Sequence, residues 1–242
     1  GYSSGQRQGL PKLVFYDDFS HGIDWLGLVL TGAGNVAASS VAADTAHVLK
    51  GDKSLKVNLQ TNAGGAADYA AVKFTPYYKH KIFMELIFGL NATAQADLTA
   101  LEIKLIIENE WAYSGARRRG NLYYSVSERK WYYDNSAGAH VKVEDGLFKC
   151  IGYVSDDARG VVWNRVGIAI DTKNGKYDFV MVGDNIYDLS TIDVMTSGAN
   201  YEYLNIHPEL TLSLPASKNV NVWFDNFKIY QYIDRERLLN FL

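Results

Sequence analysis

Residues 161–182 read VVWNRVGIAIDTKNGKYDFVMV, and this stretch decides the fold class. Apolar side chains occupy every second position on both sides of a central polar sequence, which is typical of strands with one buried face. Asn174-Gly175 in that polar sequence supplies the positive φ values of a tight turn. The stretch therefore predicts an antiparallel hairpin. Six alternating side chains are expected to share the core: Val166, Ile168, Ile170, Tyr177, Phe179 and Met181.

The rest of the chain has the same rhythm. Four prolines and 21 glycines separate short segments of period two, and helical spacing of apolar residues is nearly absent before residue 234. About a dozen strands at this spacing predict an all-β fold, a sandwich of two antiparallel sheets. The expected strands are residues 12–16, 54–59, 70–74, 81–90, 98–108, 120–127, 130–135, 140–143, 161–171, 176–182, 209–214 and 220–232.

Composition bounds the class of protein. The chain has 242 residues, of which 48% are apolar and 21% charged, so it can bury a full core. Its 24 Lys and Arg against 27 Asp and Glu give a net charge of −3, which argues against a nucleic-acid partner. A single cysteine, Cys150, excludes an internal disulfide framework. No apolar run approaches the length of about 20 residues that spans a membrane.

The chain reads as one domain. We expect a polar N-terminal arm over residues 1–10, a single β-sandwich over residues 11–233, and a C-terminal tail over residues 234–242. Asp234 can cap a short helix in the tail. The apolar end of the tail then either folds back on its own domain or docks on a neighbouring subunit, which would make a homo-oligomer. That end consists of Leu238, Leu239, Phe241 and Leu242.

Three segments carry a resemblance to a known fold family. Residues 14–20 read VFYDDFS and precede Trp25, residues 51–57 read GDKSLKV, and residues 220–230 read VNVWFDNFKIY. Together they resemble the jelly-roll sandwiches of concanavalin A-like lectins, glucanases and carbohydrate-binding modules. The resemblance implies that the first and last strands pair. It also implies a choice of roles, because members bind glycans, cleave them, or serve as structural sandwiches in secreted proteins and virus particles.

A calcium site is expected where the terminal strands would pair. The resemblance places Asp17 and Asp18 near Asp225 and Asn226. Calcium accepts oxygen ligands from carboxylates, amides and backbone carbonyls, and these four side chains supply such oxygens. The alternative is that they accept hydrogen bonds from turn backbone, as Asp and Asn commonly do.

Catalytic carboxylates are hard to place in the sequence. Glycoside hydrolysis needs two carboxyl groups about 5–5.5 Å or 6.5–9.5 Å apart, and Glu85 and Glu102 are the weak candidates on central strands. The Glu-x-Asp-x-x-Glu run of jelly-roll glucanases is absent. Glu102-Ile103-Lys104 alternates acid and base around an apolar residue, which is typical of a solvated sheet face.

A dense group of aromatic and arginine residues is the best candidate for a binding site. Sugar rings stack their apolar faces on exposed aromatic rings, while polar side chains bond the hydroxyls. Because Trp131 and Tyr132 are neighbours in an extended strand, they face opposite sides, and the alternative is that these aromatics pack in the core. The candidate ligand-binding residues are Trp111, Tyr113, Arg117, Arg118, Arg119, Tyr123, Trp131 and Tyr132.

The sequence thus favours a non-catalytic sandwich that binds a polysaccharide or oligosaccharide, with an extracellular or virion-surface location. One alternative is a structural subunit of a virus particle or surface layer that uses the sandwich for protein contacts. The other is a divergent glycoside hydrolase or lyase. A cleft lined by two close carboxylates would favour an enzyme, whereas an aromatic platform would favour binding.

Overall fold

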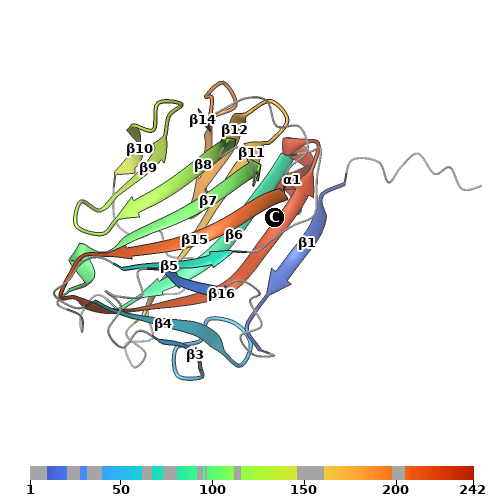
Figure 1. The fold of residues 1–242 in the computed structure, drawn as a ribbon. Coiled ribbons are helices and arrows are strands. Elements are labelled where there is room, and N and C mark those ends of the chain that lie inside the picture. The colour runs from blue at the N-terminus through green and yellow to red at the C-terminus, as the bar shows by residue number, and fades with distance from the viewer. Residues whose placement is uncertain are drawn as a thin grey trace, which may run out of the picture.

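The computed structural model describes residues 10–20, 28–31, 40–61, 67–72, 81–91, 95, 97–111, 116–145, 161–197 and 205–242. Two antiparallel sheets stack face to face, and one short helix follows the last strand (Figure 1). The prediction of an all-β sandwich is confirmed. Within the described residues, no helix is long and apolar enough to cross a membrane.

Sheet A contains both terminal strands. Its order is β13-β12-β11-β6-β16-β4-β3, and β1 pairs with β16 beyond the end of β4. The pairing of the first and last strands, which the resemblance implied, is confirmed. The strands are β1 (Lys12–Asp17), β3 (Ser40–Asp44), β4 (Ser54–Gln60), β6 (Lys81–Leu90), β11 (Val162–Asp171), β12 (Lys176–Val182), β13 (Asn185–Asp188) and β16 (Asn219–Tyr232).

Sheet B lies against sheet A. Its order is β10-β9-β8-β7-β15-β5-β2, and β14 pairs with the first part of β8. The strands are β2 (Leu28–Thr31), β5 (Ala67–Val72), β7 (Glu102–Trp111), β8 (Ala116–Ser125), β9 (Lys130–Asp134), β10 (His140–Asp145), β14 (Met195–Ser197) and β15 (Asn205–Leu214).

Most predicted strands lie where alternation placed them, and two, β6 and β12, have the predicted bounds. The prediction for residues 98–108 is wrong at its start, because Leu98–Ala100 form a 3-10 turn before β7 begins. Sequence reasoning missed β2, β3, β13 and β14. These are three to five residues long, which is too short for a period of two to stand out.

The core fills the space between the sheets. Alternate residues of β6 and β11 in sheet A point into it, including Met84, Phe88 and Ile168. From sheet B, Tyr124 and Trp131 pack with their ring centroids 4.5 Å apart. The hairpin of β8 and β9 places Leu122, Tyr124 and Val126 in this core beside Trp131 and Tyr133.

A β-bulge corrects part of the first hairpin. Ala169 lies opposite Phe179, but the next residue, Ile170, lies opposite Tyr177, so Asp178 is an extra residue on β12. A one-residue shift turns every following side chain to the other face. Phe179 and Met181 therefore pack on the outer face of sheet A, whereas Val180 and Val182 take their places between the sheets.

The turn of that hairpin also differs from its prediction. Residues 172–175 form a four-residue turn, and Gly175 has a φ of +66° whereas Asn174 does not have a positive φ. The amide of Gly175 donates to the carbonyl of Asp171 at 2.9 Å, and Asp171 Oδ1 accepts from the amides of Lys173 and Asn174. The Asp171 side chain thus organises the turn, and a single glycine meets its conformational need.

The C-terminal tail forms helix α1 (Arg235–Phe241) and folds back on its own domain (Figure 1). The Asp234 side chain accepts from the amides of Glu236 and Arg237, as the capping prediction required. Leu238 is fully buried against the outer face of sheet A. Arg235 binds both carboxylate oxygens of Asp188, at 2.8 and 3.1 Å. The structure gives no support for an oligomer through this tail.

Candidate functional site

The two outer faces of the sandwich differ in what covers them. On sheet A, α1 covers an aromatic cluster through Leu238. A second cluster on that face packs against Leu49. The clusters consist of Phe83, Ala169, Phe179, Met181, Tyr230 and Tyr232 near the helix, and of Ile87, Val161, Trp163 and Trp223 near Leu49. Described residues therefore cover these two parts of the outer face of sheet A.

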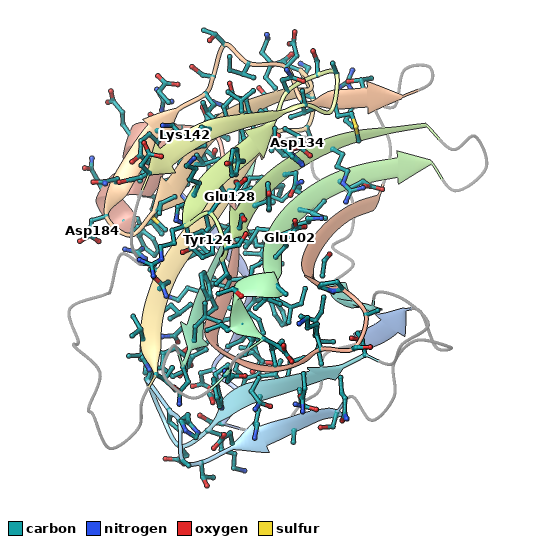
Figure 2. The ribbon with its side chains drawn as sticks, turned by 90° about the vertical axis from the view of Figure 1, so that its left-hand side faces the viewer. Glu102, Tyr124, Glu128, Asp134, Lys142 and Asp184 are labelled. Carbon is teal, nitrogen blue, oxygen red and sulfur yellow. The ribbon has the colours of Figure 1, made fainter. Side chains whose placement is uncertain are left out.

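The outer face of sheet B carries polar and aromatic side chains in rows that cross the strands. Residues that lie directly opposite each other in neighbouring strands share a face and touch. One row runs from β10 to β7 and places a pair of tyrosines between two lysines. In order, it consists of Lys142, Tyr132, Tyr123 and Lys104. Figure 2 views the molecule from the side of β9 and β10 and labels Asp134 and Lys142 there.

The tyrosine pair forms the centre of this face. The rings of Tyr123 and Tyr132 stack with centroids 5.1 Å apart and an angle of 18°. The His140 ring lies 4.7 Å from that of Tyr123, and Lys104 Nζ lies 5.7 Å from the Tyr123 centroid. Tyr123 is only 7% exposed, whereas Tyr132 is partly exposed and His140 is exposed. Tyr132 and His140 thus offer aromatic surface to solvent over a buried ring.

Asp134 organises the neighbouring row. One of its carboxylate oxygens contacts His140 Nδ1, and the other accepts from the amide of Asn121 at 2.8 Å. The Asp134 backbone carbonyl also accepts from the Tyr177 hydroxyl at 2.7 Å. Asn121 is 4% exposed, and its Oδ1 atom has no hydrogen-bond partner. The carboxylate therefore fixes both the histidine ring and the orientation of the amide.

The two tyrosines are neutral over the ordinary pH range. The hydrogen bond that the Tyr132 hydroxyl donates to Glu128 raises the pKa of Tyr132 to about 12. Burial raises the pKa of Tyr123, and the nearby carboxylates of Glu102 and Glu128 raise it further. Neutral phenols stack and donate hydrogen bonds, but they are poor general bases at neutral pH.

Charges on this face are paired with one another. Lys104 lies 3.3 Å from Glu102, Lys142 lies 2.6 Å from Asp145, and Arg119 lies 3.5 Å from Glu108. These are distances between the cationic nitrogens and carboxylate oxygens. The expectation that Glu102 and Lys104 belong to a solvated sheet face is confirmed, since both side chains are partly exposed and paired.

The predicted aromatic set divides between the core and this face. Tyr123 and Tyr132 lie on the face together. The prediction that Trp131 binds a ligand is wrong, because its side chain is 1% exposed and packs against Phe88 in the core. Trp111 belongs to β7 by its backbone, and its side chain lies outside the described part. Tyr113 lies entirely outside the described residues.

The three arginines also divide, as their alternation in a strand requires. Arg119 lies on the outer face opposite Glu108, and Arg117 lies opposite Glu110 by its backbone register. Arg118 points the other way, and its guanidinium donates to the carbonyls of Thr172 and Lys173 in the β11–β12 turn, at 3.0 and 2.6 Å. The side chain of Arg118 therefore ties sheet B to the β11–β12 turn of sheet A, and its role in ligand binding stays a prediction.

The two candidate catalytic glutamates lie on opposite sides of the molecule. Glu85 alternates with core residues of β6 and so faces outward from sheet A, where its Oε1 atom lies 2.6 Å from Arg165 Nε. Glu102 faces outward from sheet B. Because the whole core separates them, they cannot flank one glycosidic bond, which excludes these two weak candidates as an acid pair.

The predicted calcium ligands lie at the β1–β16 pairing and bond to backbone. Asp17 and Asp18 accept from the amides of Phe19 and Ser20, at 2.7 and 3.0 Å. Asp225 is fully buried and accepts from the amides of Leu49 and Lys50. Burial raises the pKa of Asp225 to about 6. The Asn226 amide oxygen accepts from the Tyr16 hydroxyl at 3.0 Å.

These contacts match the alternative in which the four side chains bond backbone. Among the described residues, no group of three or more His, Cys, Asp and Glu side chains could hold a metal ion. A calcium ion at this place would rely on backbone and amide oxygens together with the carboxylates. The calcium site therefore stays a prediction.

Sequence reasoning missed other residues of the site, among them Lys104, Asn121, Asp134 and His140. The alternation signal that selected Tyr123 and Tyr132 also places Asn121 and Asp134 on their side of the strands. What the sequence lacked was the register between β9 and β10, which brings His140 opposite Asp134.

Comparisons with known proteins bear on the fold. No family model and no curated protein matches the chain. An endo-β-1,4-glucuronan lyase from the fungus Trichoderma reesei is similar in structure, with a TM-score of 0.57, 14% identity, and coverage of 91% of this chain and 96% of that one. The CBM22-1 xylan-binding domain of Paenibacillus barcinonensis Xyn10C has a TM-score of 0.41, 12% identity, and coverage of 93% and 98%.

A family 16 endo-glucanase from Bacteroides ovatus has a TM-score of 0.47, 12% identity, and coverage of 89% of this chain and 99% of that one. At these identities the comparisons show the fold alone. The chain has a two-sheet β-sandwich fold that is similar to the fold of the glucuronan lyase. This fold-level resemblance is what residues 14–20, 51–57 and 220–230 indicated.

Proposed function

We propose that the outer face of sheet B binds a polysaccharide or oligosaccharide, with Tyr132 as its stacking ring. The observation that carries this proposal is the stacked tyrosine pair on the outer face, bordered by His140. A partly exposed ring that rests on a buried ring cannot turn away when a ligand arrives. A sugar can therefore stack on Tyr132 at little cost in side-chain entropy.

Polar groups around the rings supply hydrogen-bond partners for sugar hydroxyls. Glu102, Glu128 and Asp134 provide carboxylate acceptors close to Tyr123, since their charges all act on its pKa. With Nδ1–H directed to Asp134, the imidazole of His140 presents Nε2 as a further acceptor. Aromatic surface bordered by a few fixed polar groups is the general form of a sugar site.

The proposal is binding without catalysis. Glu85 and Glu102 lie on opposite sides of the core, and the tyrosines have raised pKa values, so neither pair supplies an obvious acid and base. The structural likeness to a glucuronan lyase supports a glycan as the partner and makes a test for products necessary.

Affinity electrophoresis through gels that contain mixed-linkage β-glucan, linear xylan or mannan tests the proposal. We expect at least one neutral polysaccharide to retard the protein, and Tyr132→Ala to weaken that binding by roughly tenfold through loss of stacking. Tyr16→Ala is the matched control, because Tyr16 is also a partly exposed tyrosine but lies on β1 of sheet A.

Two outcomes would overturn the proposal. One is a protein that no polysaccharide retards, which would favour a structural subunit. The other is equal weakening by Tyr132→Ala and Tyr16→Ala, which would place binding elsewhere. Release of new reducing ends, or of an unsaturated product absorbing in the ultraviolet, would show that the face is catalytic.

A further inference from the structure

The tyrosine pair lies between two lysines that are both neutralised. Lys142 and Lys104 occupy the two ends of the row that contains Tyr132 and Tyr123. At about 4.8 Å between neighbouring strands, this row is about 14 Å long, which is the length of two to three sugar units. A glycan lying along the row would therefore reach both lysines.

Each lysine in the row has its own acid. Glu102 is two residues before Lys104 on β7 and on the same face, and their charged groups are 3.3 Å apart. Asp145 lies 2.6 Å from Lys142 and also faces Lys130 across the β9–β10 register. The hydrogen bond from Lys142 lowers the pKa of Asp145, and the charge of Lys130 lowers it further. Each end of the row thus pairs its lysine with a carboxylate.

On the rest of the outer face of sheet B, positive and negative side chains are also paired. Arg119 pairs with Glu108, and His140 contacts Asp134. Among the described side chains on this face, the cations are accompanied by at least as many carboxylates. The carboxylates are Glu102, Glu108, Glu128, Asp134 and Asp145, and the cations are Lys104, Arg119, Lys130 and Lys142, with His140 beside them.

We infer that this face selects neutral glycans and that Glu102 and Asp145 are the residues that exclude anionic ones. The inference rests on the proposed function and names its ligand class. A uronate or sulfate placed over the tyrosines would have to break a lysine–carboxylate pair and would then lie beside the displaced carboxylate. A neutral sugar meets no such repulsion, and its hydroxyls can donate to those same carboxylates.

The test compares retention by neutral mixed-linkage β-glucan and by anionic polygalacturonate. The variant Glu102→Gln/Asp145→Asn keeps the shape of both side chains and frees Lys104 and Lys142. We expect the wild-type protein to prefer β-glucan and the double variant to gain roughly tenfold in affinity for polygalacturonate at about 20 mM salt. That gain should disappear at about 1 M salt, where exposed charges are screened.

The matched control is Asp193→Asn. This substitution frees Lys176 from its ion pair with Asp193, in which the charged groups are 2.7 Å apart. The pair is also exposed to solvent, but Lys176 lies on β12 of sheet A. The control adds one positive charge, whereas the double variant adds two. A gain of roughly threefold in the control would therefore show that added net charge alone explains the tenfold effect, and the inference would fail. Wild-type protein that binds polygalacturonate as tightly as β-glucan would also overturn it, while leaving the proposed function intact.

Failure of the proposed function has a different signature. If none of β-glucan, xylan, mannan and polygalacturonate retards the wild-type protein, glycan binding itself is wrong. A double variant that keeps its affinity for β-glucan and gains none for polygalacturonate would refute only the role of Glu102 and Asp145. Thermal unfolding of all variants confirms that each is folded, since exposed pairs contribute little to stability.

Discussion

The outer faces of the two sheets carry similar residue types but use them differently. Sheet A pairs Glu85 with Arg165 between aromatic clusters, and Glu85 is 3% exposed. Sheet B pairs Glu102 with Lys104 beside the tyrosine pair, and both side chains are partly exposed. The same acid–base pattern thus produces a buried structural pair on one face and a wet pair next to a candidate ligand platform on the other.

The difference lies in what packs above each sheet. Helix α1 and Leu49 cover the ends of the sheet A face. The bulge at Asp178 helps to hold the helix there, because the buried Asp178 carboxylate accepts from the Tyr232 hydroxyl at 2.7 Å and lies 3.2 Å from Lys81. Arg235 of the helix also donates to the Asp178 carbonyl at 3.2 Å. In the part of the chain that the structure describes, the candidate ligand surface lies on the face opposite to the one that α1 covers.

The largest expected difference between the two faces is in the free energy of unfolding that is lost when one ion pair on each face is broken. Arg165→Met leaves the buried Glu85 carboxylate without its cation and should lower the free energy of unfolding by about 3–5 kcal/mol. Lys104→Met leaves the partly exposed Glu102 in water and should cost less than about 1 kcal/mol. Urea unfolding of the two variants measures both values.

A control follows from the same physics. Replacing both partners, as in Glu85→Leu/Arg165→Met, should recover much of the stability that Arg165→Met loses, because no buried charge remains. Similar small losses from Arg165→Met and Lys104→Met would contradict the distinction between the faces.

The predicted calcium ion offers a second test of the covered face, where Asp225 is fully buried. If calcium binds there, calcium at about a hundred times its dissociation constant should stabilise the fold by about 2.7 kcal/mol. Differential scanning fluorimetry with excess chelator should then show a lower Tm, and Asp18→Asn should abolish the response. An unchanged Tm, with no metal found by elemental analysis, removes the site.

Asp44 gives a smaller, pH-dependent effect on the covered face. Burial raises its pKa, but hydrogen bonds from Trp223, Ala46 and His47 outweigh this and lower the pKa to about 2. Because the folded-state pKa is below the unfolded value, ionised Asp44 stabilises the fold above about pH 4, and this stability is lost as the pH falls toward 2. The contribution is about 2 kcal/mol.

The measurement is the difference in unfolding free energy between wild type and Asp44→Asn at pH 6 and at pH 2.5. We expect this difference to shrink in acid by about 2 kcal/mol. Asp145→Asn is the control from the open face, where the pKa of Asp145 is lowered mainly by the hydrogen bond from Lys142 and solvent screens the pair. If the stability difference from wild type changes equally with pH in both variants, Asp44 and Asp145 are equally exposed to solvent, which contradicts the distinction between the faces.

Much of the fold follows from alternation in the sequence. Period-two segments place nearly all of the longer strands, and Val166, Ile168 and Ile170 point into the core as predicted. The resemblance of the chain ends implied the β1–β16 pairing. The sequence predicted only part of the site. Alternation along the strands puts Tyr123 and Tyr132 on one face. Trp131 was also a candidate, and only the structure shows that its side chain is buried.

Local pattern alone determined that this chain is a sandwich of strands, because the period of apolar residues depends only on backbone geometry. Tertiary structure decided which side of each strand became core and which outer face stayed open. The extra residue Asp178 turns Phe179 outward, and the sheet assignments separate Glu85 from Glu102, although both glutamates have similar local surroundings in the sequence. Strand register, and the packing of α1 on the outer face of sheet A, depend on contacts between segments that are distant in the sequence. The sequence of one strand alone does not determine them.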